Sequence, residues 1–168
     1  SGSVTSMTAG LASGSTFPVG TTTVTYEVVD SSGNTVSCSF DVTVNDTEDP
    51  VAVCQDVTVN LDGTGTATVT AADVDNGSTD NCGTGGLTYG LTGGTYTVVG
   101  TYTETLTVTD AAGNNHTCTT TITVTDITPP VAVCQDITIQ LDGTGNVTIV
   151  GTDIDGGSTD NGFIVSYT

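Results

Sequence analysis

Apolar and polar residues alternate along most of the chain, which is the pattern of β-strands that bury one face. Valine, tyrosine, phenylalanine and cysteine alternate with threonine, serine and acidic residues in segments 24–28 and 38–44. Glycine and asparagine at 30–34 and 110–114 are typical of hairpin turns, and no segment carries a helical stripe. The same alternation marks further strands at 57–59, 67–69, 106–108 and 122–124.

The chain repeats itself at a spacing of 80 residues. Segment 50–56, which reads PVAVCQD, recurs at 130–136, and segment 77–81, which reads GSTDN, is matched by the same five letters at 157–161. About seven short strands per repeat, separated by turns, predict an all-β fold of tandem immunoglobulin-like antiparallel β-sandwiches.

Proline-containing linkers near Pro50 and Pro130 set the phase of the repeat, because proline stops strand pairing. We therefore expect a complete unit at residues 47–126, with the C-terminal half of a preceding unit at 1–46 and the N-terminal half of a following unit at 127–168. Such a chain is either a window cut from a longer repetitive protein or a subunit whose halves complete those of its neighbours.

Charge narrows the possible partners. The 168 residues include 19 Asp and Glu but neither Lys nor Arg, so the formal net charge is −19. Such a surface repels nucleic acid, and the sequence offers no apolar run long enough for a membrane span. Hydrophobic residues make up 35% of the chain, which together with 22 glycines is sufficient for a packed core.

Segments 14–26 and 30–40, together with Asp80-Asn81-Cys82 and the opening at 50–54, resemble the hyalin repeat (HYR) signature. The second unit departs from that signature at 96–98, where Tyr-Thr-Val replaces Phe-Pro-Val, and at 119–120. The resemblance covers essentially the whole chain. It implies a secreted, immunoglobulin-like adhesion module, of the kind found in long tandem arrays on bacterial surface proteins.

The five cysteines fit an oxidised, secreted protein. Cys54 lies near the first strand of the complete unit and Cys118 near the last strand. Because these two strands can run parallel, a Cys54–Cys118 disulfide is feasible. The alternative is that both are free buried thiols. Their repeat equivalents, Cys134 and Cys38, need partners outside their own half-units. Cys82 has no counterpart, because glycine occupies the equivalent positions, and we expect it to be free or bonded outside the chain.

Acidic residues gather in the linkers and in the loops expected at the same end of the sandwich. Close carboxylates without a neutralising cation are costly, and Ca²⁺ with oxygen ligands is the natural remedy. The alternative is that they are solvated turn residues. The candidate ligands are Asp46, Glu48, Asp49, Asp73, Asp75, Asp80, Asp110, Asp126, Asp153, Asp155 and Asp160.

Nothing in the sequence points to an enzyme. The single histidine, His116, has Val36 as its repeat equivalent, and the sequence shows no nucleophile elbow or phosphate loop. The leading hypothesis is a structural segment of an extracellular adhesin or filament, stabilised by calcium and bound to neighbouring repeats or subunits. The alternatives are a self-complementing subunit that polymerises head-to-tail into a fibre, and a module that binds glycans or a host surface.

Overall fold

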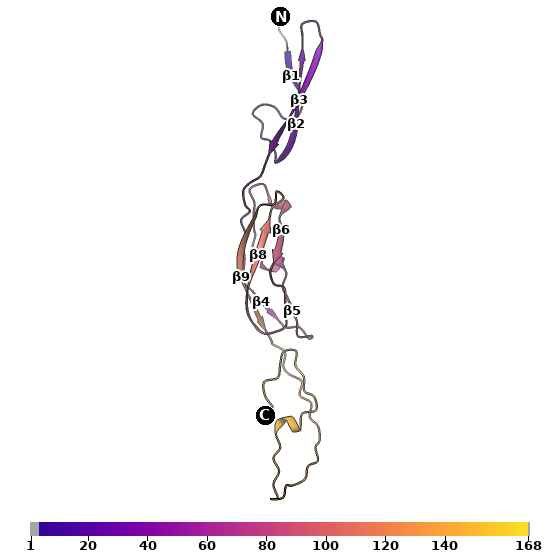
Figure 1. Ribbon diagram of the computed structural model, residues 1–168, viewed down its shortest axis with the longest axis vertical. Helices are drawn as coiled ribbons and strands as arrows, with labels where there is room; N and C mark the ends of the chain where they lie inside the picture. The colour runs from indigo at the N-terminus through magenta and orange to yellow at the C-terminus, as the bar shows by residue number, and fades with distance from the viewer. Residues whose placement is uncertain (1–3, 168) are drawn as a thin grey trace.

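The computed structural model describes residues 4–167, and these form three parts that follow one another along the long axis of the molecule (Figure 1). Strand β3 ends at Val44 and strand β9 at Thr125, next to the two predicted boundaries. Residues 1–3 and 168, which belong to the predicted outer halves, lie outside the described residues.

The middle part contains most of the described strands, and they pair mainly in the antiparallel sense. Four of them form a sheet in the order β4-β9-β8-β6, and β5 pairs with β7 in a second, two-stranded sheet. The two sheets enclose one core, as expected for a β-sandwich. The strands are β4 (Val57–Asn60), β5 (Ala67–Thr68), β6 (Thr88–Leu91), β7 (Thr95–Tyr96), β8 (Gly100–Thr109) and β9 (Asn115–Thr125).

The core of the middle part comes from the alternating apolar positions of its strands. Leu106 and Val108 of β8, together with Ile122 of β9, are fully buried. A single turn of helix, α1 (Ala71–Val74), adds the buried side chain of Val74. Leu61, Ala67, Val69, Tyr96 and Val124 complete the cluster.

The first and last strands of the middle part are parallel, the arrangement that the sequence analysis considered for the cysteine pair. Residues Val57–Asn60 of β4 pair with Ile122–Thr125 of β9. Cys54 and Cys118 are joined in a disulfide with their Cα atoms 5.9 Å apart. The disulfide that the sequence made feasible is therefore present.

The first part is a three-stranded sheet in the order β1-β2-β3, made of β1 (Val4–Ala9), β2 (Gly20–Val29) and β3 (Thr35–Val44). Strands β2 and β3 are the 80-residue equivalents of β8 and β9, and they pair in the same antiparallel way. No described strand of this chain lies beside the outer edge of β3, where β4 lies in the middle part.

The third part has the same isolated β-bridges as the first half of the middle part, but it lacks the strands. Isolated bridges join Val131 to Thr159 and Cys134 to Asp155, just as Val51 joins Thr79 and Cys54 joins Asp75. Between residues 127 and 167 the described backbone forms these bridges and a 3₁₀ turn, η2 (Gly151–Asp153), but no strand. The remaining helical segment is η1 (Thr84–Gly86), and none of the helices described in the chain has the length and apolarity to cross a membrane.

Candidate metal centre at the junctions between repeats

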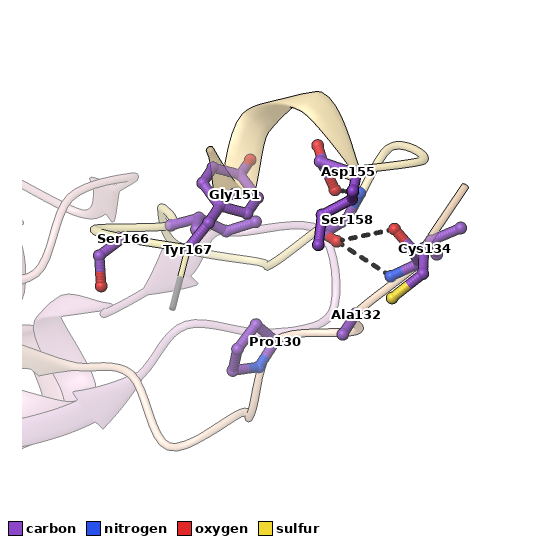
Figure 2. Close-up of a pocket in the computed structure, with 11 residues that line it drawn as sticks. Pro130, Ala132, Cys134, Gly151, Asp155, Ser158, Ser166 and Tyr167 are labelled. Carbon is purple, nitrogen blue, oxygen red and sulfur yellow. Dashed lines mark hydrogen bonds between the residues drawn. The ribbon is translucent and has the colours of Figure 1, made fainter. Parts of the chain in front are cut away.

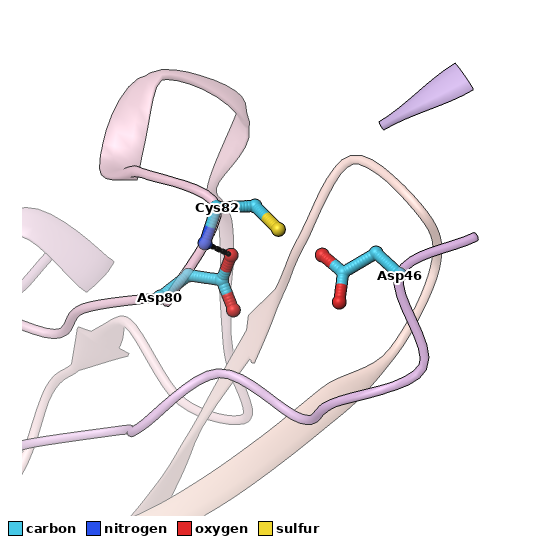
Figure 3. Close-up of side chains that lie close together, drawn as sticks. All are labelled: Asp46, Asp80 and Cys82. Carbon is cyan, nitrogen blue, oxygen red and sulfur yellow. Dashed lines mark hydrogen bonds between the residues drawn. The ribbon is translucent and has the colours of Figure 1, made fainter. Parts of the chain in front are cut away.

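Two carboxylates face each other at the junction between the first and middle parts. Asp46 follows β3 in the linker, whereas Asp80 and Cys82 lie in a loop of the middle part (Figure 3). One ligand atom from each of these three residues lies within 4.8 Å of the other two. Asp80 Oδ2 accepts a hydrogen bond from the Cys82 amide at 2.9 Å, but its Oδ1 is buried without a partner. A buried carboxylate oxygen without a donor calls for a cation or a water molecule.

The raised pKa of the Cys82 thiol reflects the negative charge at this junction. The hydrogen bond between the Cys82 thiol and Asp46 raises the pKa of Cys82, and burial and the charges of Asp46, Asp80 and Asp110 raise it further. Cys82 is therefore a neutral thiol near pH 7 and a poor ligand for a hard cation. The chain has no Lys or Arg to neutralise the carboxylates.

Asp110 contributes charge to this junction, while its own oxygens are occupied. Its side chain is 7% exposed and accepts hydrogen bonds from the amides of Ala112, Gly113 and Asn114 and from the Asn114 side chain. Burial alone would raise the pKa of Asp110, but these hydrogen bonds outweigh burial and lower it. The Asn114 amide also donates to the Asp46 carbonyl at 3.3 Å, which links this hairpin to the linker.

The same arrangement recurs 80 residues later. Asp126 follows β9, and Asp160 lies in the loop that is equivalent to that of Asp80. Oδ2 of Asp126 and of Asp160 lie 2.5 and 3.2 Å from the point that a Cβ would occupy at Gly162, so these two carboxylates are neighbours. Asp160 Oδ2 accepts a hydrogen bond from the Gly162 amide at 2.9 Å, and its Oδ1 is again buried without a partner.

The second junction adds an asparagine that the sequence did not single out as a ligand. The Asn161 amide nitrogen donates to the carbonyls of Leu61 and Asp62 at 3.3 and 3.0 Å, which ties the third part to the middle part. Its Oδ1 is buried and unpaired, beside Asp160 in the sequence. The signal for it was the recurrence of Asp-Asn at 80–81 and 160–161.

Comparison of the two junctions separates the candidate ligands that both share from the one that occurs at a single junction. Cys82 has Gly162 as its equivalent, so a thiol is present at one junction only. The shared donors are a linker aspartate, Asp46 or Asp126, and a loop aspartate, Asp80 or Asp160, all of them oxygen donors. Carboxylate and carbonyl oxygens are the ligands that suit Ca²⁺, so the residues present fit that ion.

Four of the expected ligands instead make local hydrogen bonds away from this pair. Asp73 caps α1 by accepting from the Thr70 amide at 2.7 Å, and Asp153 accepts from the Val150 amide at 2.9 Å in the same way. Asp75 and Asp155 accept from the amides of the serines three residues later. The structure therefore does not bring these four carboxylates to the junction pairs, because the cap and turn geometry holds them further back in the loop.

The remaining candidates line the first linker. Glu48 accepts a hydrogen bond from the Asn81 side chain, which joins the linker to the loop of Asp80. Asp49 is exposed. His116 lies on the exposed part of β9, where its Nδ1 accepts a hydrogen bond from the Ala52 amide at 3.1 Å.

The comparisons with known proteins relate the chain to the HYR domain and to hyalin. The HYR domain family matches residues 1–44. The chain is 37% identical to hyalin of the sea urchin Strongylocentrotus purpuratus over 166 residues, covering 87% of this chain but 13% of hyalin. Because this relative is a sea-urchin protein, it does not support the bacterial setting expected from the resemblance.

The matches among solved structures include extracellular domains of two protocadherins. Protocadherin gamma B7 domains 1–4 are 17% identical, with a TM-score of 0.35 over 73% of this chain and 36% of theirs. The protocadherin gamma B4 extracellular domain is 21% identical, with a TM-score of 0.33 over 70% of this chain and 22% of its own.

Proposed function

We propose that this chain is a non-enzymatic structural segment of an extracellular adhesion protein, in which calcium ions at the junctions fix successive repeats to each other. The similarity to the HYR domain and to hyalin supports the adhesion class. The Cys54–Cys118 disulfide favours an oxidising, extracellular location.

The observation that carries the calcium proposal is the recurrence of one electrostatic arrangement at both junctions. In each, a linker aspartate faces a loop aspartate whose Oδ1 is buried without a donor. At the first junction one oxygen of each carboxylate lies within 4.8 Å of the other, and the chain has no Lys or Arg to offset their repulsion. A bound divalent cation would convert this repulsion into attraction between the linker and the loop.

The ligand set also indicates how tightly calcium binds. Asp46 and Asp80 supply two carboxylates at the first junction, and Asp126, Asp160 and the Asn161 carbonyl oxygen are available at the second. Affinity for Ca²⁺ rises with the number of charged ligands, and extracellular modules bind with Kd on the order of 10⁻⁴–10⁻³ M. We expect both junctions to bind in that range.

Calcium titration followed by limited proteolysis tests this proposal. A protease of broad specificity is needed, because the chain has no Lys or Arg for trypsin. We expect millimolar Ca²⁺ to slow cleavage in linkers 45–50 and 126–130, and EDTA to restore it. Asp80→Asn is expected to abolish protection of the first linker alone, and Asp160→Asn protection of the second.

The matched control is Asp41→Asn, which removes the same charge from an exposed position on β3. This variant should keep both protections. Equal cleavage rates with Ca²⁺ and with EDTA in the unsubstituted chain would refute the calcium proposal. Loss of protection in Asp41→Asn as well would show that net charge matters rather than the junction sites.

A further inference from the structure

The asparagines of this chain fall into two groups by sequence. Four of the nine begin an Asn-x-Ser/Thr sequon, the acceptor motif for N-linked oligosaccharides, and the other five do not. A motif this short arises by chance in a chain rich in threonine, so the sequence alone assigns no site. The sequon asparagines are Asn45, Asn76, Asn115 and Asn146.

The structure separates the two groups by what their side chains do. Each of the five asparagines outside the sequons uses its side-chain amide in a hydrogen bond that holds a turn, a strand end or a junction in place. By contrast, Asn76 and Asn115 are exposed, and their side chains form no hydrogen bond with any described residue. The five bonded asparagines are Asn34, Asn60, Asn81, Asn114 and Asn161.

The contrast is sharpest between two neighbours on the hairpin before β9. Asn114 donates its side-chain amide to Asp110 Oδ2 at 2.8 Å and to the Asp46 carbonyl at 3.3 Å. The next residue, Asn115, has an exposed side chain. A glycan replaces one hydrogen of the amide nitrogen with a bulky sugar, so it suits an asparagine whose amide is free. Asn115 meets this condition and Asn114 does not.

Asn76 lies in a loop that keeps its form without an asparagine. In the middle part the Ser78 amide donates to Asp75 at 3.2 Å. In the third part the Ser158 amide donates to Asp155 at 2.8 Å in the same way (Figure 2). Glycine stands at the equivalent of Asn76 in the third part. The side chain of Asn76 is therefore not needed for the loop and is free for modification.

Both free asparagines lie at the end of the middle part that meets the first junction. The Asn76 amide donates to the Val53 carbonyl at 2.9 Å. The preceding residue, Ala52, donates its amide to Nδ1 of His116 at 3.1 Å, and His116 follows Asn115. One short segment of backbone therefore contacts both the loop of Asn76 and the strand of Asn115.

The other two sequon asparagines carry no part of the inference. Asn146 uses its side-chain amide within its own turn, where it donates to Thr144 Oγ1 at 3.0 Å. Asn45 has Thr125 as its equivalent in the middle part, and that side chain is half-buried. The inference therefore rests on the two sequons of the complete unit at 47–126.

We propose that Asn76 and Asn115 carry N-linked oligosaccharides. The reaction joins the side-chain nitrogen of asparagine to the anomeric carbon of a sugar supplied by a lipid diphosphate donor. The bond between that carbon and the diphosphate oxygen breaks, the lipid diphosphate leaves with the electron pair, and the amide nitrogen loses one proton. The inference goes beyond the structural role proposed above, but it rests on the extracellular location, because this modification belongs to secreted chains.

The burial of Ser78 determines when Asn76 is modified. The Ser78 hydroxyl completes the sequon, but this side chain is 4% exposed and accepts a hydrogen bond from the Val53 amide at 3.0 Å. A transferase can therefore reach it only before the loop folds. Thr117, which completes the sequon of Asn115, is exposed. For this reason the test uses the chain as a cell secretes it, rather than a folded chain treated afterwards.

Peptide mapping of the chain secreted from a eukaryotic cell line is the primary test. After reduction, chymotryptic cleavage gives peptides 62–87 and 107–141, each with one sequon asparagine and one other asparagine. Peptide N-glycosidase in heavy-oxygen water converts a glycosylated asparagine to labelled aspartate, and a sample without enzyme controls for deamidation. We expect the label at Asn76 and Asn115 and none at Asn81 or Asn114.

Matched variants test whether the sequons direct the modification. Asn76→Gly and Asn115→Thr introduce the residues that stand at the equivalent positions of the repeat, so the fold should be kept. Each should lower the intact mass by one glycan. Thr117→Ser and Thr117→Val form a pair at one exposed position. Thr117→Ser should keep the label at Asn115, and Thr117→Val should remove it although the asparagine is unchanged.

Several outcomes would overturn the inference. Absence of the label from Asn76 or Asn115 would overturn the assignment of that site. A label at Asn115 in Thr117→Val, or equal labels at Asn81 and Asn114, would show that the sequon and the free amide do not select the site. The calcium proposal is judged separately, since an unmodified chain whose linkers Ca²⁺ protects from proteolysis would refute only the glycan inference. A modified chain without calcium protection would refute only the calcium proposal.

Discussion

Removal of the Cys54–Cys118 disulfide should destabilise the middle part strongly, because the crosslink closes most of it into one loop. The two cysteines are 64 residues apart in the sequence. In the chain-entropy treatment a loop of that length restricts the unfolded chain by about 4.3 kcal/mol at 25 °C. For a domain of this size that corresponds to a drop in melting temperature of roughly 15–30 °C.

The assay compares the oxidised chain with the double variant Cys54→Ala/Cys118→Ala in urea. Buried Tyr96 offers a fluorescence signal for the middle part, and the chain has no tryptophan to obscure it. If the disulfide acts through the unfolded state, the variant should also show a larger m value, because its unfolded chain is more expanded.

The matched control is the triple variant Cys38→Ser/Cys82→Ser/Cys134→Ser, which keeps the disulfide and should keep the midpoint of the middle part. A loss below about 1 kcal/mol with an unchanged m value would refute the reasoning, since it would mean that the unfolded chain is not loosened by opening the loop.

Three further predictions concern the core, the acidic turns and the first sheet. Leu106→Ala, at a fully buried position, should cost about 2–5 kcal/mol in urea unfolding, whereas Val36→Ala at an exposed one should cost little. The pKa of Asp110 is lowered in the folded chain, so its charge stabilises the fold above its ordinary pKa of 3.8, and this stability is lost as the pH falls through the pKa of the folded state. In a series of urea midpoints measured against pH, Asp110→Asn should make the loss of stability at acid pH less steep. An unchanged slope would contradict this prediction. Gly10→Ala should lower the melting temperature of the first sheet, since Gly10 has φ of +92° and a Cβ would lie 2.7 Å from the Thr23 carbonyl oxygen; an unchanged melt would show that the strand simply shifts.

The strand positions were predictable because they depend on local alternation. Segments 24–28 and 38–44 fall within β2 and β3, and 122–124 within β9. The fold class allows the first and last strands to run parallel, so the cysteine pair of the middle part could be named as a feasible disulfide. The single-turn helices were not anticipated, since segments of three or four residues carry no periodicity.

The acidic sites were predictable only in part. The sequence grouped Asp73 and Asp75 with Asp80 because all three lie in one loop, but a loop of that length can hold each carboxylate in a different place. Hydrogen bonds to Thr70 and Ser78 keep the first two in local caps and turns. Only the folded chain could show this, because these bonds compete with any metal for the same oxygens.

The sequence by itself determined the 80-residue repeat, the strands, the excess of negative charge and the cysteines that can pair, since these properties depend on residue type and spacing alone. Tertiary structure decided which carboxylates meet and which apolar faces stay open. Asp80 Oδ1 is buried without a donor, and Leu141 is exposed although Leu61 is not. Burial depends on what lies opposite a residue, so equivalent positions of a repeat acquire different environments when different residues face them.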